Sequence, residues 1–305
     1  MKLLYFFEGL RTPWLDRIML LITELGGEIF FMALAIALFW CYSKRMGYYV
    51  LTVGFTGTLF NQFLKLACRV SRPWVKDPSF TIVEGARAAA TGYSFPSGHT
   101  QNAAASLGCM ACEAKHKMLR AVLWVLYALV AISRMYLGVH TPWDVGVSLV
   151  LGLALMFALR PLFRDVEQHP KRMYALLGGM AGLALLYLLY TQLFPFPADI
   201  EIENLDSGIK NAYTLLGAVT GMIVAYWLDQ RYIHFSVRGS AGAQIVKCAL
   251  GLALTVMLRA VLKPPLNALF QGAPAAHAVR YFLVVLFAAG VWPMTFPWIC
   301  KKLPD

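Results

Sequence analysis

The chain has 305 residues, of which 59% are hydrophobic and 14% charged, against about 45–50% and about 25% in a soluble globular domain. This composition excludes a soluble enzyme, a disordered protein and a fibrous repeat, and it indicates a polytopic membrane protein. The formal net charge is +11, but no basic stripe or nucleic-acid-binding module accompanies it, so we expect no nucleic-acid partner.

The amino-terminal segment, residues 1–26, mixes apolar and charged positions. Leu15, Ile18 and Leu21 recur at helical spacing, while Asp16 and Arg17 occupy the other positions. A helix with one apolar and one charged face favours the membrane surface over its interior. We therefore predict an interfacial amphipathic helix here rather than a membrane span.

Apolar segments follow along the rest of the chain. A spanning helix needs about 20 mostly apolar residues, and the sequence predicts about nine such helices, the first and third of them short. They cover residues 27–42, 47–68, 99–113, 119–137, 143–162, 173–193, 210–228, 243–262 and 279–300. The expected fold class is all-α, a polytopic membrane helical bundle.

The connections between these segments alternate in charge. One set is basic throughout, at residues 43–45, 115–120, 160–172, 231–238 and 301–302, and positive loops face the cytoplasm. The carboxyl terminus is then cytoplasmic. Two connections on the opposite side are also basic, residues 69–87 and the stretch around Arg134 and His140. A bound anion is the reason we infer for that exception.

The first chemical cluster ends the second predicted span. Lys65 and Arg72 are seven residues apart, so they share a face if the helix continues, and Pro73 then stops it. Both cations suit a phosphate. The alternative is a pair of side chains that snorkel to the membrane interface.

The second cluster is Pro96-Ser97-Gly98-His99, directly before the third apolar segment. Free backbone N–H groups at a helix start bind anions, Gly98 permits close approach, and Ser97 adds a hydroxyl. His99 lies where it could donate a proton to a leaving oxygen. An ordinary capping sequence with an incidental histidine is the alternative.

The third cluster contains Arg134, His140, Thr141, Pro142 and Asp144. Thr141 can cap the next helix, with Pro142 at its first position, and Asp144 could merely complete a capping box. Alternatively, the Asp144 carboxylate holds the Nδ1–H of His140 and leaves Nε2 free as a nucleophile. Arg134 supplies a planar, permanently charged group suited to phosphate.

Taken in order, the three clusters resemble the signature of the type 2 phosphatidic acid phosphatase superfamily, which includes bacterial acid phosphatases and vanadium haloperoxidases. That signature is K-x6-R-P, then P-S-G-H, then S-R-x5-H-x3-D. The sequence matches it without departure at Lys65…Arg72-Pro73, Pro96-Ser97-Gly98-His99 and Ser133-Arg134…His140…Asp144. Three parts in the right order make the resemblance specific.

The resemblance implies a role for each matching residue. His140 attacks phosphorus and forms a phosphohistidine, Asp144 orients His140, and His99 protonates the leaving group. The phosphate oxygens are held by Lys65, Arg72, Ser97, Gly98 and Arg134. The resemblance implies no metal and no cofactor, and the motifs have no cluster of Asp/Glu ligands such as a two-metal phosphatase uses.

These observations predict an integral-membrane lipid phosphate phosphatase with an extracytoplasmic active site, and a bacterial inner membrane is its expected location. Residues 27–165 form its catalytic core, residues 1–26 the interfacial segment, and residues 166–305 a four-helix region to which the sequence assigns no role. Undecaprenyl diphosphate or phosphatidylglycerophosphate is the expected substrate, with phosphatidic acid, lipid A and sphingoid-base phosphates as alternatives. A vanadium-dependent peroxidase and a non-catalytic lipid-phosphate binder or transporter stay open, and the oligomeric state is unassigned.

Overall fold

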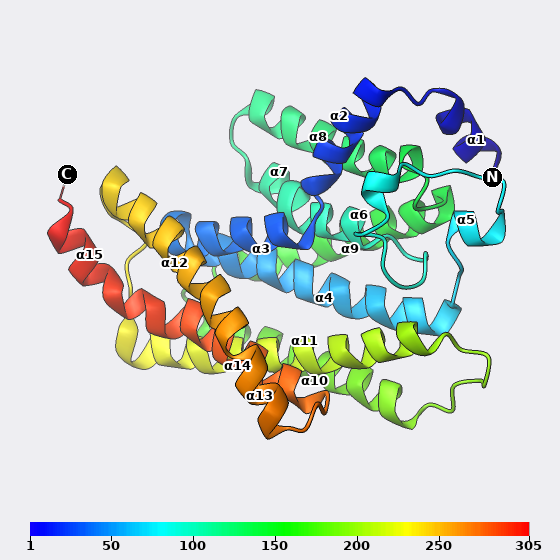
Figure 1. The fold of residues 1–305 in the computed structure, drawn as a ribbon. Helices are drawn as coiled ribbons and strands as arrows, with labels where there is room; N and C mark the ends of the chain where they lie inside the picture. The colour runs from blue at the N-terminus through cyan, green and yellow to red at the C-terminus, as the bar shows by residue number, and fades with distance from the viewer. Residues whose placement is uncertain (305) are drawn as a thin grey trace. The chain divides into compact units, whose positions relative to one another are not determined.

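The computed structural model of the chain describes residues 1–304 and contains helices and loops, with no β-strand in that range (Figure 1). An all-α fold was predicted, and this is confirmed. The chain divides into two compact units, each described by itself below. The first comprises Met1–Met32, Tyr49–Leu162 and Glu201–Asn204, and the second contains the remaining described residues.

The first unit contains most of the amino-terminal helices. Its elements are α1 (Lys2–Gly9), α2 (Pro13–Glu24), the greater part of α4 (Lys44–Cys68), α5 (Pro73–Lys76), α6 (Gly98–Ala103), α7 (Cys109–Glu113), α8 (Lys117–Tyr136) and α9 (Pro142–Phe163). A π-helical turn, Ala104–Gly108, joins α6 to α7. Helix α3 (Glu28–Ala37) continues into a second π-helical turn, Leu38–Tyr42.

Helix α2 packs along α8 in this unit (Figure 1). Thr12 caps α2 by accepting the N–H of Leu15, and Pro13 occupies the first helical position. One apolar face of α2, with Leu15, Met19 and Leu20, packs against a cluster of buried residues, namely Ala86, Tyr136, Leu137 and Val139. The amino-terminal segment therefore forms two short helices, and the second one covers the carboxyl end of α8.

Helix α4 and the α6–α7 stretch form the interior of the first unit. Every residue from 49 to 57 of α4 is buried, and so is nearly every residue from 100 to 109. Gly57 lets α4 approach α6, because a Cβ at this position would clash with the side chain of Gln101. Lys65 and the Pro96–His99 motif therefore lie at the ends of helices that pack largely against protein.

The second unit contains α10 (Pro170–Leu193), α11 (Ile202–Leu228), α12 (Ala241–Val261), α13 (Lys263–Leu269), α14 (Ala275–Leu286) and α15 (Phe296–Lys302). Tyr187 of α10 donates to the carbonyl of Gly208 on α11 at 3.2 Å. A Cβ at Gly221 of α11 would lie 2.8 Å from the carbonyl oxygen of Phe282 on α14, so the two backbones approach closely. Small residues permit such contacts between membrane helices.

The predicted number of nine spans is wrong. Among residues 1–304, six helical stretches are long and apolar enough to cross a membrane, or seven if α2 and Glu28–Tyr42, which meet at 45°, form one span. The six are Lys117–Tyr136, Pro142–Phe163, Pro170–Leu193, Ile202–Ile233, Ala241–Leu269 and Ala275–Lys302. Each coincides with one of the last six predicted segments.

Three predicted segments are not candidate spans by themselves, namely residues 27–42, 47–68 and 99–113. Helix α4 is long enough, with 25 residues, but it carries Thr52, Asn61 and Lys65 among its apolar residues. The α6–α7 stretch is too short, and α3 has only 10 residues before its π-helical turn. Most residues of α4 and of the α6–α7 stretch are buried against protein, whereas Ile29 of α3 is 84% exposed. Composition alone does not distinguish burial in protein from contact with lipid.

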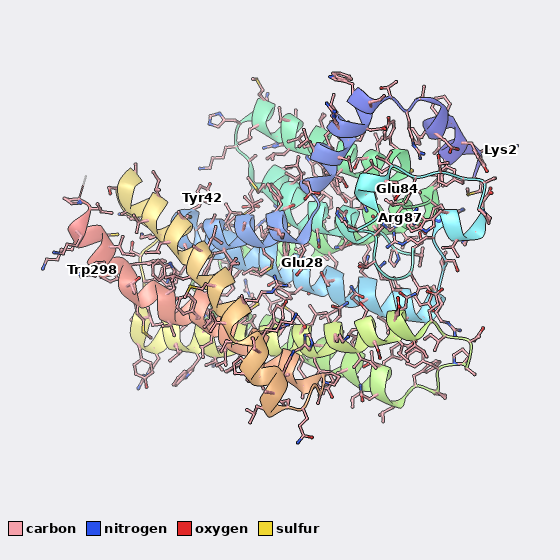
Figure 2. All side chains as sticks on the ribbon, viewed as in Figure 1. Lys2, Glu28, Tyr42, Glu84, Arg87 and Trp298 are labelled. Carbon is pink, nitrogen blue, oxygen red and sulfur yellow. The ribbon has the colours of Figure 1, made fainter. Side chains whose placement is uncertain are left out.

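Large apolar side chains remain exposed on the outside of the molecule. Figure 2 shows two of them, Tyr42 and Trp298, which are 72% and 64% exposed. A surface that faces lipid is apolar because the hydrocarbon region contains no water that could form hydrogen bonds with polar groups. Together with the six apolar helices, this surface is that of an integral membrane protein.

Candidate active site

All eight residues that the motifs single out lie in the first unit. They come from four places in the chain: the end of α4, the loop before α5, the start of α6, and the α8–α9 corner. The structure brings Lys65, Arg72, His99, Arg134 and His140 close enough for their charges to interact. The motif spacing therefore corresponds to one site, assembled from segments up to about 80 residues apart.

Arg72 is held almost entirely by backbone carbonyls. Its Nε donates to Gly92 O at 3.0 Å, its Nη2 to Thr91 O at 2.7 Å, and its Nη1 to Val139 O at 2.9 Å. These neutral acceptors fix the plane of the guanidinium without cancelling its charge. Burial lowers the Arg72 pKa to about 10, so the side chain remains positive at neutral pH.

Arg134 lies in the last turn of α8 and is fully buried, at 0% exposure. Its Nη1 donates to the Thr23 hydroxyl of α2 at 2.6 Å, while its Nε and Nη2 have no hydrogen-bond partner. A buried guanidinium with unsatisfied donors is costly unless a ligand supplies acceptors. The two free nitrogens are therefore suited to two oxygens of an anion.

His140 lies in the α8–α9 corner and is 2% exposed. Its Nε2 is 3.1 Å from Arg72 Nη1. Since arginine can only donate, Nε2 accepts and carries no proton, which places the imidazole proton on Nδ1. The His140 pKa lies well below its ordinary value of 6.5, first because of burial and then because Arg72 and Arg134 are positive. The ring is therefore neutral with its Nε2 lone pair available.

Asp144, in the first turn of α9, faces the other side of that ring. Its Oδ2 is 3.5 Å from His140 Nδ1, which is an ion-pair distance and longer than a normal hydrogen bond. The same oxygen accepts the Ser94 hydroxyl at 2.5 Å and the Thr141 N–H at 2.7 Å. Thr141 Oγ1 in turn accepts the Asp144 N–H at 3.3 Å. Capping and proximity to His140, which the sequence posed as alternatives, occur together.

The Pro96–His99 motif opens α6. Ser97 is the N-cap: its Oγ accepts the Thr100 N–H, and its own N–H donates to the Asp144 carbonyl at 3.1 Å. At Gly98, only Asn61 Oδ1 lies near the place of a Cβ, at 4.0 Å. That side of Gly98 is open to a ligand. The half-buried His99 follows directly, near the three cations of the site.

Lys65 reaches the site differently from the sequence expectation. Helix α4 ends at Cys68, and Arg69 has a left-handed φ of 49°, so the chain turns away before Arg72. Lys65 and Arg72 therefore do not share a helix face. Instead, Lys65 Nζ donates to the carbonyl of Tyr93, in the segment whose Thr91 and Gly92 carbonyls hold Arg72.

Two functional contacts were missed by sequence reasoning. Thr23 binds Arg134 from a helix 111 residues earlier in the chain, and no spacing rule connects the two. Ser94, which donates to Asp144, lies two residues before the start of the second cluster at Pro96. Its closeness to the motif was the available signal for Ser94.

The fold and the site together define an all-helical membrane protein with a buried, cation-lined anion site and two histidines. Comparison with known proteins agrees with that class. Residues 44–167 match the PAP2 superfamily, and residues 213–301 match the PAP2 superfamily phosphatase transmembrane extension. No solved structure matches the chain.

Three characterised proteins are similar to the chain. Phosphatidylglycerophosphatase B of Bacillus subtilis is 34% identical over 176 residues, which cover 53% of this chain and 82% of that protein. The dihydrosphingosine 1-phosphate phosphatase C823.11 of Schizosaccharomyces pombe is 28% identical, covering 74% and 56% respectively. The lipid A 4'-phosphatase of Bacteroides thetaiotaomicron is 24% identical, covering 73% and 93%.

The chain belongs to the PAP2 superfamily. It is a membrane lipid phosphatase of that family, and its reaction class is hydrolysis of a phosphoric ester. The site residues above coincide with the part of the chain that matches the superfamily, except that Thr23 lies before it.

Proposed function

We propose that the chain hydrolyses the terminal phosphate of a membrane lipid through a phosphohistidine at His140, without a metal ion or cofactor. The observation that carries the proposal is the contact between Arg72 Nη1 and His140 Nε2. It gives the imidazole the tautomer that a nucleophile needs, and it joins that nucleophile to a residue that binds phosphate.

In the first step, the Nε2 lone pair of His140 attacks phosphorus and the bond from phosphorus to the leaving oxygen breaks. His99 donates its proton to that oxygen. Phosphorylated His140 carries a positive ring, which the Asp144 carboxylate stabilises from the Nδ1 side. In the second step, His99 takes a proton from water, the oxygen attacks phosphorus, and inorganic phosphate leaves as His140 is restored.

The cations supply the electrostatic part of catalysis. Arg134 offers two donors without a partner, and Lys65, Arg72, Ser97 and Gly98 complete the set that we assign to the phosphate oxygens. An incoming oxygen competes with Nε2 for Arg72, so substrate binding itself frees the nucleophile. Because these charges are in place before the reaction, they stabilise the phosphoryl group in the transition state without a rearrangement of the site.

Phosphatidylglycerophosphate is the substrate that we propose first, because the relative with 34% identity is a phosphatidylglycerophosphatase. Undecaprenyl diphosphate and phosphatidic acid share the same terminal phosphate chemistry. Sphingoid-base phosphate and lipid A 4'-phosphate are favoured by the two other relatives. A panel of all five separates them.

We propose that the active site faces the extracytoplasmic side and that the carboxyl terminus is cytoplasmic. If the six candidate spans alternate in direction along the chain, the connections at residues 115–120, 160–172, 231–238 and 301–302 belong to one membrane side and residues 137–141 to the other. The first set is basic, as cytoplasmic ends are. Since two relatives are bacterial proteins, a bacterial inner membrane is the location that we propose.

The test is phosphate release by the purified full-length protein from the lipid panel, with and without EDTA. We expect turnover that EDTA does not change and that His140→Ala abolishes. His99→Ala protein, incubated with 32P-labelled substrate and quenched in alkaline detergent, should carry phosphate on His140 that is stable in alkali and lost in acid. If folded wild-type protein binds the lipids but releases no phosphate, the chain is a binder or transporter instead. EDTA-sensitive turnover would remove the metal-free mechanism.

A further inference from the structure

A second group of basic side chains lies in the transmembrane extension, where the motifs assign nothing. Arg259 is in the last turn of α12, Lys263 opens α13, and His277 and Arg280 lie in the first turns of α14. Lys210 of α11 interacts electrostatically with His277, as Lys263 and Arg280 do. All five belong to the second unit.

Arg280 is the innermost member of this group, only 7% exposed, and its Nε has no hydrogen-bond partner. Its Nη2 is 3.1 Å from His277 Nδ1. Since arginine only donates, Nδ1 accepts and the His277 proton is on Nε2. The half-buried His277 thus presents a second donor beside the unsatisfied Arg280 Nε.

The charges of the group are not balanced. Arg259 and Arg280 both lie over the ring of Tyr281, at 5.6 and 5.2 Å from its centroid. Within residues 1–304, none of the five basic residues forms an ion pair with a carboxylate. Cations within a membrane span are costly unless an anion compensates them.

The position of the group indicates the source of that anion. His277 and Arg280 lie in the first turns of α14, where the candidate span Ala275–Lys302 begins, and Arg259 and Lys263 lie in the carboxyl-terminal half of the candidate span Ala241–Leu269. Phospholipid phosphates lie at this level of a bilayer, and basic pockets between membrane helices bind anionic headgroups. Lys210, Lys263 and Arg259 are exposed, whereas Arg280 is buried.

We propose that these five residues form a binding site for the phosphate of an anionic phospholipid headgroup, separate from the catalytic residues. Arg280 and His277 bind phosphate oxygens directly, and the exposed lysines and Arg259 attract the headgroup. The lipid is a ligand here and undergoes no reaction. The site therefore goes beyond the proposed function and does not depend on it.

The test uses the full-length protein in a neutral detergent and measures lipid retention by native mass spectrometry. The probes are phosphatidylglycerol and phosphatidylcholine with the same acyl chains. Both are phosphodiesters, so hydrolysis of a terminal phosphate cannot consume them. We expect the wild type to retain phosphatidylglycerol in preference to phosphatidylcholine. Arg280→Gln should weaken the binding of phosphatidylglycerol about tenfold, as expected for the loss of one charge-assisted hydrogen bond.

Lys301→Gln removes an equal charge from the exposed end of α15 and should bind phosphatidylglycerol as the wild type does. His140→Ala should also bind normally, which separates this site from catalysis. If Arg280→Gln does not fold, His277→Gln replaces it, with the same direction of effect. Unchanged binding in the folded variant, or equal retention of both lipids by the wild type, overturns the proposal. Saturation of the site by inorganic phosphate without preference for the lipid overturns the lipid assignment.

Discussion

Cationic side chains that are partly or fully buried are held in two ways in this protein, and the difference lies in their partners. Lys44 of the second unit is 2.6 Å from the Asp229 carboxylate, and Arg160 of the first unit is 2.8 Å from Glu113. Arg134 has one hydroxyl and two unsatisfied nitrogens. A carboxylate neutralises the cation that it holds, whereas a hydroxyl orients the cation and leaves its charge available.

The difference separates structural charges from those that bind. Arg72 follows the same rule as Arg134, because backbone carbonyls hold it and no carboxylate lies within ion-pair distance. A bound phosphate accepts hydrogen bonds from such a cation and balances its charge, whereas a carboxylate partner would compete with that phosphate. Variants of paired cations should therefore change stability, and variants of unpaired ones should change catalysis.

The largest effect is expected at Arg134. Arg134→Gln removes two donors assigned to the phosphate oxygens, and loss of one such donor costs on the order of 100- to 1000-fold in kcat. We expect a loss near 1000-fold in the initial rate of phosphate release, with an unfolding temperature at or above the wild type. The matched control is Arg160→Gln, whose rate should stay within about threefold. Equal losses in both variants would contradict the distinction.

A smaller effect, on stability alone, is expected at Asp229. Asp229 is 1% exposed and its loss leaves Lys44 without a counter-ion. Breaking a buried pair from one side costs on the order of 3 kcal/mol, so Asp229→Asn should lower the free energy of unfolding by about that amount. The rate per folded molecule should not change. The exposed pair of His169 with Asp165 offers a control, since Asp165→Asn should alter stability much less.

The third prediction concerns pH. Burial, followed by the charges of Arg72 and Arg134, lowers the pKa of His140 well below 6.5, so the neutral nucleophile persists as pH falls through 6.5. Arg72→Gln removes one of those positive charges, and imidazolium then forms more easily, so the pKa should rise. NMR titration of labelled histidine in the two proteins measures it directly. A pKa unchanged or lower in the variant would rule out the electrostatic explanation.

The smallest effect is expected at an exposed pair near the site. Figure 2 shows Glu84 and Arg87, which lie 2.8 Å apart, side by side on the loop before α6. Both side chains are at least half exposed, and solvent screens such pairs. Glu84→Gln should leave the rate and the unfolding temperature unchanged. A clear loss of either would show that pairing on the surface also matters here.

The sequence predicted the outer helices better than the inner ones. The spans from residue 117 onward were found because their apolar residues are long uninterrupted runs. Helix α4 and the α6–α7 stretch were counted as spans because burial in protein requires the same residue types as contact with lipid. Local composition does not distinguish a helix buried in protein from a helix in contact with lipid. The distinction depends on which other helices pack around it.

The residues of the site were predicted from motif spacing, but the way they are held was not. Arg72 depends on the carbonyls of Thr91, Gly92 and Val139, and every residue type has a carbonyl. Thr23 is one of many threonines until α2 packs on α8 and places it beside Arg134.

The bond from Thr23 to Arg134 has a practical consequence for anyone who wishes to shorten this enzyme. The superfamily match begins at residue 44, and a truncation designed from it would discard α2. That protein would lose the hydroxyl that orients Arg134 and uncover the apolar end of α8. A deletion into α2 therefore removes one of the supports of the site.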